Sequence, residues 1–335
     1  MTTLLKATSP AELLGLIPTL AGFTPRESLV LLPFRGTRTG GAMRIDLPGP
    51  SADLDAYAAT VVGLLCQIPQ LTAVAVAVYD EAPVTTPLPR HELAVRLLDR
   101  IDACGFEVIE AMYVGADDWA VYFDEGAQRH PLAEVPLPPA VPGVGDVSGD
   151  QRAGAQLIPP PPGARKALRE ALGRRSPVSA QRPEDVPALA DEALTGPPDV
   201  DQDAALVAML NAPLCRDIAL AHWARGGEVT ARGPRDPSRA MATVLAGMGP
   251  PPDVDRVRLA LALCRRLAAL APAAQRSGPL VAAAWLSWAL GRSSHADEYL
   301  QQVLRRDPEH RLAGLLVAAL AAGMLPTWVF AAPTA

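Results

Sequence analysis

The sequence has few of the residues on which most recognisable catalytic chemistry depends. Its 335 residues include four cysteines and five histidines, and lysine occurs only at Lys6 and Lys166 among 30 basic residues. Aromatic residues make up 4% of the chain, and the net charge is -6. An acidic chain lacks the long-range attraction to nucleic acid and anionic membranes that a basic chain has, so we expect neither as a partner.

The four cysteines are far apart in the sequence. Cys66, Cys104, Cys215 and Cys264 form no C-x-x-C pair and have no histidine at ligand spacing. This spacing excludes the common zinc and dithiol motifs. We therefore expect each cysteine to behave as a small buried hydrophobic residue, and the sequence implies no cofactor.

No apolar run is long enough to cross a bilayer. The longest, residues 312–325, is shorter than the roughly 20 residues that a membrane-spanning helix needs. The apolar stretch within residues 1–18 is broken and ends in proline, unlike the uninterrupted core of a signal peptide. We expect a cytoplasmic protein.

The N-terminal part alternates strand and helix patterns. Ser9, Pro10 and Glu12 are typical of a helix start and predict a helix over residues 10–20. Strands are expected at residues 29–34, 43–47, 72–78, 106–114 and 119–123, and further helices at residues 51–67 and 88–104. Crossover helices make strands parallel and hairpins make them antiparallel. Residues 1–130 are thus predicted to form an α/β domain with a mixed sheet of about five strands and packed helices.

Proline separates this part from a helical one. The chain has 35 prolines, and their concentration over residues 131–163 predicts a linker. Residues 164–325 are helical in pattern throughout, which predicts an all-α domain, and residues 326–335 are expected to be a tail. Helices are predicted at residues 164–174, 184–194, 201–224, 237–247, 253–270, 279–290, 296–305 and 309–323.

One pair of these helices has the spacing of a tetratricopeptide hairpin. Such a hairpin needs a small residue at its turn, an alanine where the second helix approaches the first, and a proline that ends the unit. Gly291, Ala296 and Pro308 meet these needs. An ordinary hairpin within a helical bundle is the alternative interpretation, and it uses the same residues.

Three blocks of the sequence resemble a known family. They are Ile17-Pro18 with Gly22-Phe23, Pro25 and Ser28-Leu29-Val30-Leu31-Leu32; then Arg44-Ile45-Asp46-Leu47-Pro48; and finally Trp288 and Gly291 with Asp307-Pro308 and Arg311-Leu312-Ala313. Together they resemble the actinobacterial domain of unknown function 4192 family. The resemblance implies a cytoplasmic protein from a GC-rich bacterium, and it implies no activity.

Three carboxylates follow predicted strands and form one candidate site. Asp46 ends the second strand, and Asp80 and Glu81 follow the third, at the edge where open α/β sheets place ligands. Carboxylates that meet there would hold Mg²⁺ and support phosphoester chemistry. The alternative is that they cap helices and end strands in turns.

Two further pairs are candidates for binding. Arg26 and Glu27 are polar residues in a loop before the first strand, where functional residues are common, although an ion pair that fixes the loop would explain them as well. Trp285 and Trp288 lie three residues apart on one helix, and aromatic residues are common at binding hot spots. Core packing is the alternative for the tryptophans.

These observations predict a non-enzymatic protein-binding or scaffold protein. No catalytic constellation is visible, and stacked helices suit contact with a protein partner or with a second copy of the chain. The rival hypothesis is a Mg²⁺-dependent phosphoesterase or nuclease that uses Asp46, Asp80 and Glu81. A sensor that binds a small ligand between the two domains is a third hypothesis.

Overall fold

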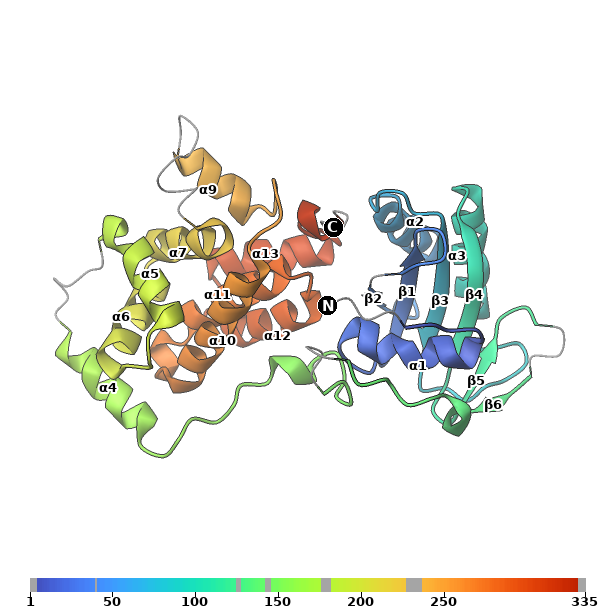
Figure 1. The fold of residues 1–335 in the computed structure, drawn as a ribbon, viewed down its shortest axis with the longest axis horizontal. Coiled ribbons are helices and arrows are strands. Elements are labelled where there is room, and N and C mark those ends of the chain that lie inside the picture. The colour runs from blue at the N-terminus through green and yellow to red at the C-terminus, as the bar shows by residue number, and fades with distance from the viewer. Residues whose placement is uncertain are drawn as a thin grey trace. The chain divides into compact units, whose positions relative to one another are not determined.

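The chain forms an α/β unit followed by a helical unit. The computed structural model describes residues 5–39, 41–124, 128–141, 146–175, 182–226 and 237–330 (Figure 1). The chain divides into two compact units, Met1–Gly154 and Ala155–Ala335. The predicted fold class is confirmed, since the first unit holds a mixed sheet with helices and the second is helical.

Within the described residues, the first unit is built on a six-stranded sheet. Its elements are α1 (Pro10–Ala21), β1 (Ser28–Phe34), β2 (Met43–Asp46), α2 (Leu54–Leu65), β3 (Ala73–Tyr79), α3 (His91–Ala103), β4 (Glu107–Val114), β5 (Asp118–Val121) and β6 (His130–Pro131). The strand order is β2-β1-β3-β4-β5-β6. Strands β3 and β4 are parallel, and the other neighbours are antiparallel.

The sheet has one strand more than the sequence predicted. His130 and Pro131 pair with Trp119 and Asp118 of β5. Proline has no N–H to give to a further strand, so it is tolerated at the edge of a sheet. A two-residue strand has no periodic pattern of its own, and its pairing therefore depends on the neighbouring strand.

Helices cover both faces of the sheet, because alternate strand residues point in opposite directions. Leu29 and Val76 belong to a core shared with α2 and α3, whereas Val30 and Ala77 belong to a second core with α1. Figure 1 shows α1 on the face opposite to α2 and α3. The unit is therefore a three-layer α/β/α arrangement.

Part of the proline-rich stretch packs against the first unit. The Thr19 hydroxyl donates to the carbonyl oxygen of Pro139 at 3.3 Å, and the Thr24 hydroxyl donates to that of Val147 at 2.8 Å. At Gly15, an added Cβ would lie 2.6 Å from the carbonyl oxygen of Pro136. Glycine at that position therefore allows the segment to lie directly on α1. Residues 142–145 lie outside the described residues.

The second unit is made of stacked helices. They are α4 (Ala164–Arg174), α5 (Val186–Thr195), α6 (Val200–Asn211), α7 (Pro213–Arg225), α9 (Pro237–Leu245), α10 (Val254–Leu270), α11 (Ser277–Ala289), α12 (Ser293–Leu304) and α13 (Arg311–Ala321). Every residue of α11 from Gly278 to Ala289 is buried. Helix α11 packs against both α10 and α12 and forms the centre of the helical core.

One predicted helix proved to be two. The single helix expected over residues 201–224 is broken at Pro213, which begins α7, because proline lacks the N–H that a continuous helix needs and favours the first helical turn. Within the described residues, no single helix has the length and apolar character to span a membrane. The pair α6 and α7, bent by 106°, passes the same test only when taken together.

The predicted tail also contains structure. Thr327–Phe330 form a 3-10 helix, and the indole N–H of Trp328 donates to the carbonyl oxygen of Ala289 at 2.9 Å. This bond attaches the segment to the end of α11. Residues 331–335 lie outside the described residues.

Candidate functional site

The predicted polar residues of the first unit lie at one end of the strands, where β1 begins and where β2 and β3 end. Ser28, the first residue of β1, pairs with Asp46 of β2 on one side and with Tyr79 of β3 on the other. Because β1 is antiparallel to both neighbours, its start lies beside their ends. Asp46, Asp80 and the loop that carries Arg26 therefore share this end of the sheet, which we call the strand-end site.

The structure pairs two of the three candidate carboxylates with different arginines. The Asp46 side chain is 78% exposed and forms an ion pair with Arg44. Asp80 accepts from Nε of Arg90 at 2.7 Å, and Glu81 is exposed. Across the described ranges, no group of three His, Cys, Asp or Glu residues is placed to hold a metal ion. The carboxylates share an end of the sheet without forming a common ligand set.

Arg90 links three segments at the strand-end site. It lies directly before α3 in a left-handed conformation, with φ of 57°. Its guanidinium donates to Asp80 at the end of β3 and, at 3.2 Å, to the carbonyl oxygen of Pro48 in the β2–α2 connection. Arg90 thus joins the start of α3, the end of β3 and the loop after β2.

The ion pair with Arg90 determines the protonation of Asp80. Partial burial alone would raise the pKa of this carboxyl, but the hydrogen bond from Arg90 and the backbone N–H of Ala82 outweigh that effect. The pKa of Asp80 is consequently lower than that of a free aspartate. The carboxylate is ionised and already accepts two hydrogen bonds.

Three tyrosine hydroxyls hold the neighbouring loops. Tyr57 donates to the carbonyl oxygen of Asp46 at 2.8 Å, Tyr113 to that of Ala82 at 2.6 Å and Tyr122 to that of Pro89 at 2.7 Å. Burial, with the nearby charge of Asp80, raises the pKa of Tyr113 to about 12. Burial also raises the pKa values of Tyr57 and Tyr122. These hydroxyls are neutral donors that fix loop positions.

The loop before β1 is held through its backbone. The Gln151 side chain accepts from the Arg26 N–H at 3.1 Å and donates to the Arg26 carbonyl oxygen at 3.0 Å. The buried Ser28 hydroxyl donates to that same oxygen and accepts from Nε of Arg44 at 2.7 Å. Ser28 therefore has a positioning role, with its hydroxyl occupied on both sides.

The side chains of Arg26 and Glu27 project from this fixed loop. Both are exposed, and neither forms an ion pair with any other residue that the structure describes, so the ion pair considered for fixing the loop is absent from this part of the chain. Glu27 has φ of 41°, a left-handed conformation that costs a non-glycine residue about 1–2 kcal/mol. Strained residues are common at functional sites, and both charged side chains of this loop are accessible to solvent.

The two tryptophans that are candidates for binding lie in the helical core, as the alternative interpretation expected. Trp285 is 0% exposed and Trp288 is 3% exposed. Their indole N–H groups donate to the carbonyl oxygens of Leu245 at 3.0 Å and Met324 at 2.9 Å. The prediction that they form a binding surface is therefore wrong, because both faces of α11 are covered by neighbouring helices.

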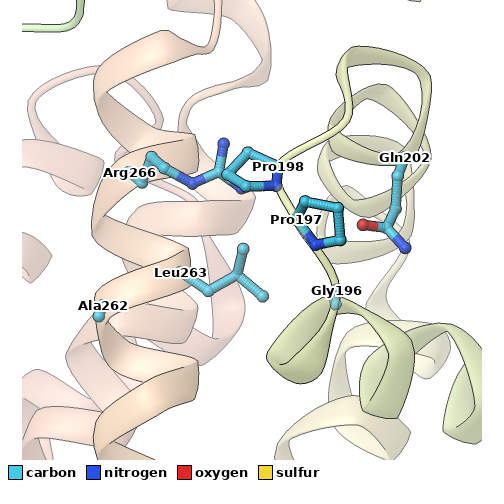
Figure 2. A pocket seen from close by; sticks show the side chains of 8 residues that line it. Gly196, Pro197, Pro198, Gln202, Ala262, Leu263 and Arg266 are labelled. Carbon is cyan, nitrogen blue, oxygen red and sulfur yellow. The ribbon is translucent and has the colours of Figure 1, made fainter.

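The helical unit has a pocket between α10 and the α5–α6 connection. Figure 2 shows Leu263 and Arg266 of α10 on one side and Pro197 and Pro198 on the other. Its volume is about 200 Å³. The Arg266 guanidinium donates to both carboxylate oxygens of Asp203, at 2.6 and 2.7 Å. The charge in the pocket wall is thus neutralised, and most of the remaining lining is apolar.

Sequence reasoning missed the residues that organise the strand-end site. An isolated arginine before a helix, such as Arg90, belongs to no motif, and Gln151 lies 125 residues from the Arg26 that it holds. A left-handed conformation at Arg90 also has no sequence signal, since glycine and asparagine are its usual residues.

A known protein family matches most of the chain. Residues 10–327 match the family described as Domain of unknown function (DUF4192). The chain belongs to the DUF4192 family. No curated protein and no solved structure matched. The DUF4192 match covers nearly all of both units, so the strand-end site and the helical core both lie within the family's domain.

Proposed function

We propose that the protein is a cytoplasmic, non-enzymatic protein-binding or scaffold protein of actinobacterial origin. Its helical unit acts as a tetratricopeptide-like stack that ends in a binding face. The observation that carries this proposal is the exposed apolar surface of α13, the last helix of the stack. The excess of arginine over lysine, typical of GC-rich coding, supports the proposed origin.

The α11–α12 hairpin supports the tetratricopeptide-like interpretation. Gly291 forms its turn with φ of 74°, a conformation that glycine adopts without strain. Ala296 is 1% exposed and belongs to the helical core that also contains α11, and Pro308 follows α12. These are the roles that a tetratricopeptide hairpin assigns to its small residues and to its terminal proline.

After its first residue, Arg311, the outer surface of α13 lacks the polar residues that usually end such a stack. Ala313 and Leu316 pack inward, whereas Leu315 is 68% exposed, and Gly314 and Ala318 are exposed beside it. No charged residue occurs between Leu312 and Leu325. Terminal helices of stacked arrays normally need a polar outer face for solubility, and exposed apolar patches mark interaction sites.

A second copy of the chain is the occupant that fits this surface. Each chain carries a net charge of -6, which opposes association elsewhere, but after Arg311 at its start α13 brings no charged side chain to an α13–α13 contact. Gly314 and Ala318 lower the surface next to Leu315, so the leucine of one copy can lie over the small residues of the other. A two-fold contact of this kind is self-complementary.

Sedimentation velocity on the full chain tests this proposal. The expected result is a dimer, twice the 35.2 kDa of one chain, which dissociates when Leu315→Glu places a charge in the contact. Leu259→Glu is the matched control, because Leu259 on α10 is 53% exposed and lies outside this surface. The proposal would be contradicted if the wild-type chain were monomeric, or if Leu315→Glu and Leu259→Glu dissociated the dimer equally.

Arg26 and Glu27 are the proposed binding residues of the α/β unit. Their side chains are exposed on a loop whose backbone is fixed by Gln151 and Ser28. A fixed loop loses little conformational entropy when it binds. Charge reversal at both positions is expected to weaken capture of a protein partner from a lysate while leaving the dimer unchanged, and unaltered capture would exclude this role.

A further inference from the structure

Two of the four cysteines are exposed, contrary to the prediction from their spacing. Cys215 and Cys264 are buried in the helical core, as expected, whereas Cys66 and Cys104 are exposed on the α/β unit. The prediction of four buried residues is therefore wrong for this pair. Both exposed cysteines end a helix, since Cys66 is the C-cap of α2 and Cys104 is the C-cap of α3.

The topology of the sheet brings these two helix ends together. Helix α2 leads into β3 and α3 leads into β4, and these strands are parallel neighbours with Ala73 opposite Glu107. Two helices that precede neighbouring parallel strands on one face run in the same direction. Helices α2 and α3 pack against each other on that face (Figure 1). Their last residues consequently meet at the same end of the layer.

The side chains of the two cysteines interact directly. Loss of hydration, the charge of a Cys104 thiolate and a hydrogen bond with Cys104 all raise the pKa of the Cys66 thiol. An interaction of this kind requires that the sulfur atoms be close. The two thiols lie 38 positions apart in the sequence and form an adjacent, solvent-accessible pair without a C-x-x-C motif.

We propose that Cys66 and Cys104 form a reversible disulfide when the protein meets a low-molecular-weight disulfide. One cysteine thiolate attacks a sulfur of the small disulfide, forms a mixed disulfide and releases one small thiolate. The second cysteine, as thiolate, attacks the protein sulfur of that mixed disulfide and releases the other. The two protein thiols are oxidised, the small disulfide is reduced to two thiols, and protons exchange with the buffer.

The bond would join α2 to α3 across the layer that covers one face of the sheet. Closing a long loop restricts the unfolded chain and stabilises the folded unit. The raised pKa of Cys66 keeps this thiol mostly protonated near neutral pH. Because the thiolate is the nucleophile, the reaction that needs Cys66 is expected to accelerate as pH rises. This site goes beyond the proposed binding function and does not depend on association through α13.

Intact-mass spectrometry of the full chain after treatment with oxidised glutathione tests the proposal. The expected product has lost two hydrogen atoms, carries no glutathione and returns to its original mass with dithiothreitol. Peptide mapping should join Cys66 to Cys104. Cys66→Ser and Cys104→Ser should each stop at a single mixed disulfide, while Cys215→Ser, the matched control, should behave as the wild type.

A second measurement separates a bond within the folded unit from one made in unfolded chains. Amide hydrogen exchange of the oxidised protein should slow in α2, α3 and β3 and remain unchanged in α10 and α11. Stable glutathione on both Cys66 and Cys104, a cross-link that involves Cys215 or Cys264, or a cross-link that forms only in denaturant would each overturn the proposal.

Discussion

Replacing Arg90 with glutamine should lower the stability of the α/β unit at the strand-end site, and the contacts of Arg90 indicate by how much. The Arg90 side chain is 35% exposed and that of Asp80 is 15% exposed. Hydrogen bonds to charged groups contribute about 1.5–3 kcal/mol, whereas exposed ion pairs contribute about 0.2–1 kcal/mol. Since this pair is only partly shielded from water, we expect Arg90→Gln to cost about 1–2 kcal/mol.

The matched control is an ion pair of the same type in a more exposed place. Arg96 pairs with Asp55 at 2.8 Å, with side chains that are 43% and 61% exposed. Arg96→Gln makes the same change of charge and should cost about 0.5 kcal/mol or less. A double-mutant cycle with Asp80→Asn, Arg90→Gln and the double variant measures the coupling energy between the two side chains.

The effect of Arg90→Gln should also depend on pH. The pKa of Asp80 is lowered in the folded state. The stability that its ionised carboxylate contributes is therefore complete above the pKa of an unfolded aspartate, about 3.9, and is lost as pH falls through the folded-state pKa. Hydrogen exchange of β3 and α3 peptides in the full chain measures local stability at pH 7 and in acid. A coupling below about 0.3 kcal/mol, within the usual error of additivity, or an equal loss from Arg96→Gln, would refute this reasoning.

Three further substitutions test individual features of the structure. Gly291→Ala should lower the stability of the helical unit by about 1–2 kcal/mol, because φ is 74° there, and a melting temperature equal to that of the wild type would contradict it. Glu27→Gly should stabilise the α/β unit by about 0.5 kcal/mol in urea titrations by removing left-handed strain, and destabilisation would show that the glutamate side chain holds the loop. Trp285→Phe leaves the Leu245 carbonyl oxygen without its donor and should lower the stability of the helical unit by about 1–3 kcal/mol. Hydrogen exchange at the end of α9 should become faster, and unchanged exchange there would argue against the bond.

The architecture of the α/β unit could be predicted because its patterns are local and regular. Ser9 and Asp53 cap α1 and α2 with their side chains, which a sequence shows directly. The run Ala73–Tyr79 is apolar on both faces, as expected for a strand covered by helices on both sides. Strand β6 could not be predicted, because pairing beside β5 alone defines it.

The position of the strand-end site could be predicted, but its partners could not. Asp46 ends β2 and Asp80 follows β3, and the structure places both beside the start of β1. Their pairing with Arg44 and Arg90 depends on side-chain directions that spacing does not encode. The burial of Trp285 and Trp288 could not be predicted either. Helical spacing places them on neighbouring positions of α11 without showing whether other helices cover them.

The molar mass of the unmodified full chain in solution, measured by light scattering over a range of concentrations, shows whether the chain associates with a second copy. If two copies associate through α13, the mass approaches twice 35.2 kDa as concentration rises and falls to that of one chain in Leu315→Glu. A mass of one chain at every concentration would contradict the claim that the outer face of α13 is a binding surface for a second copy.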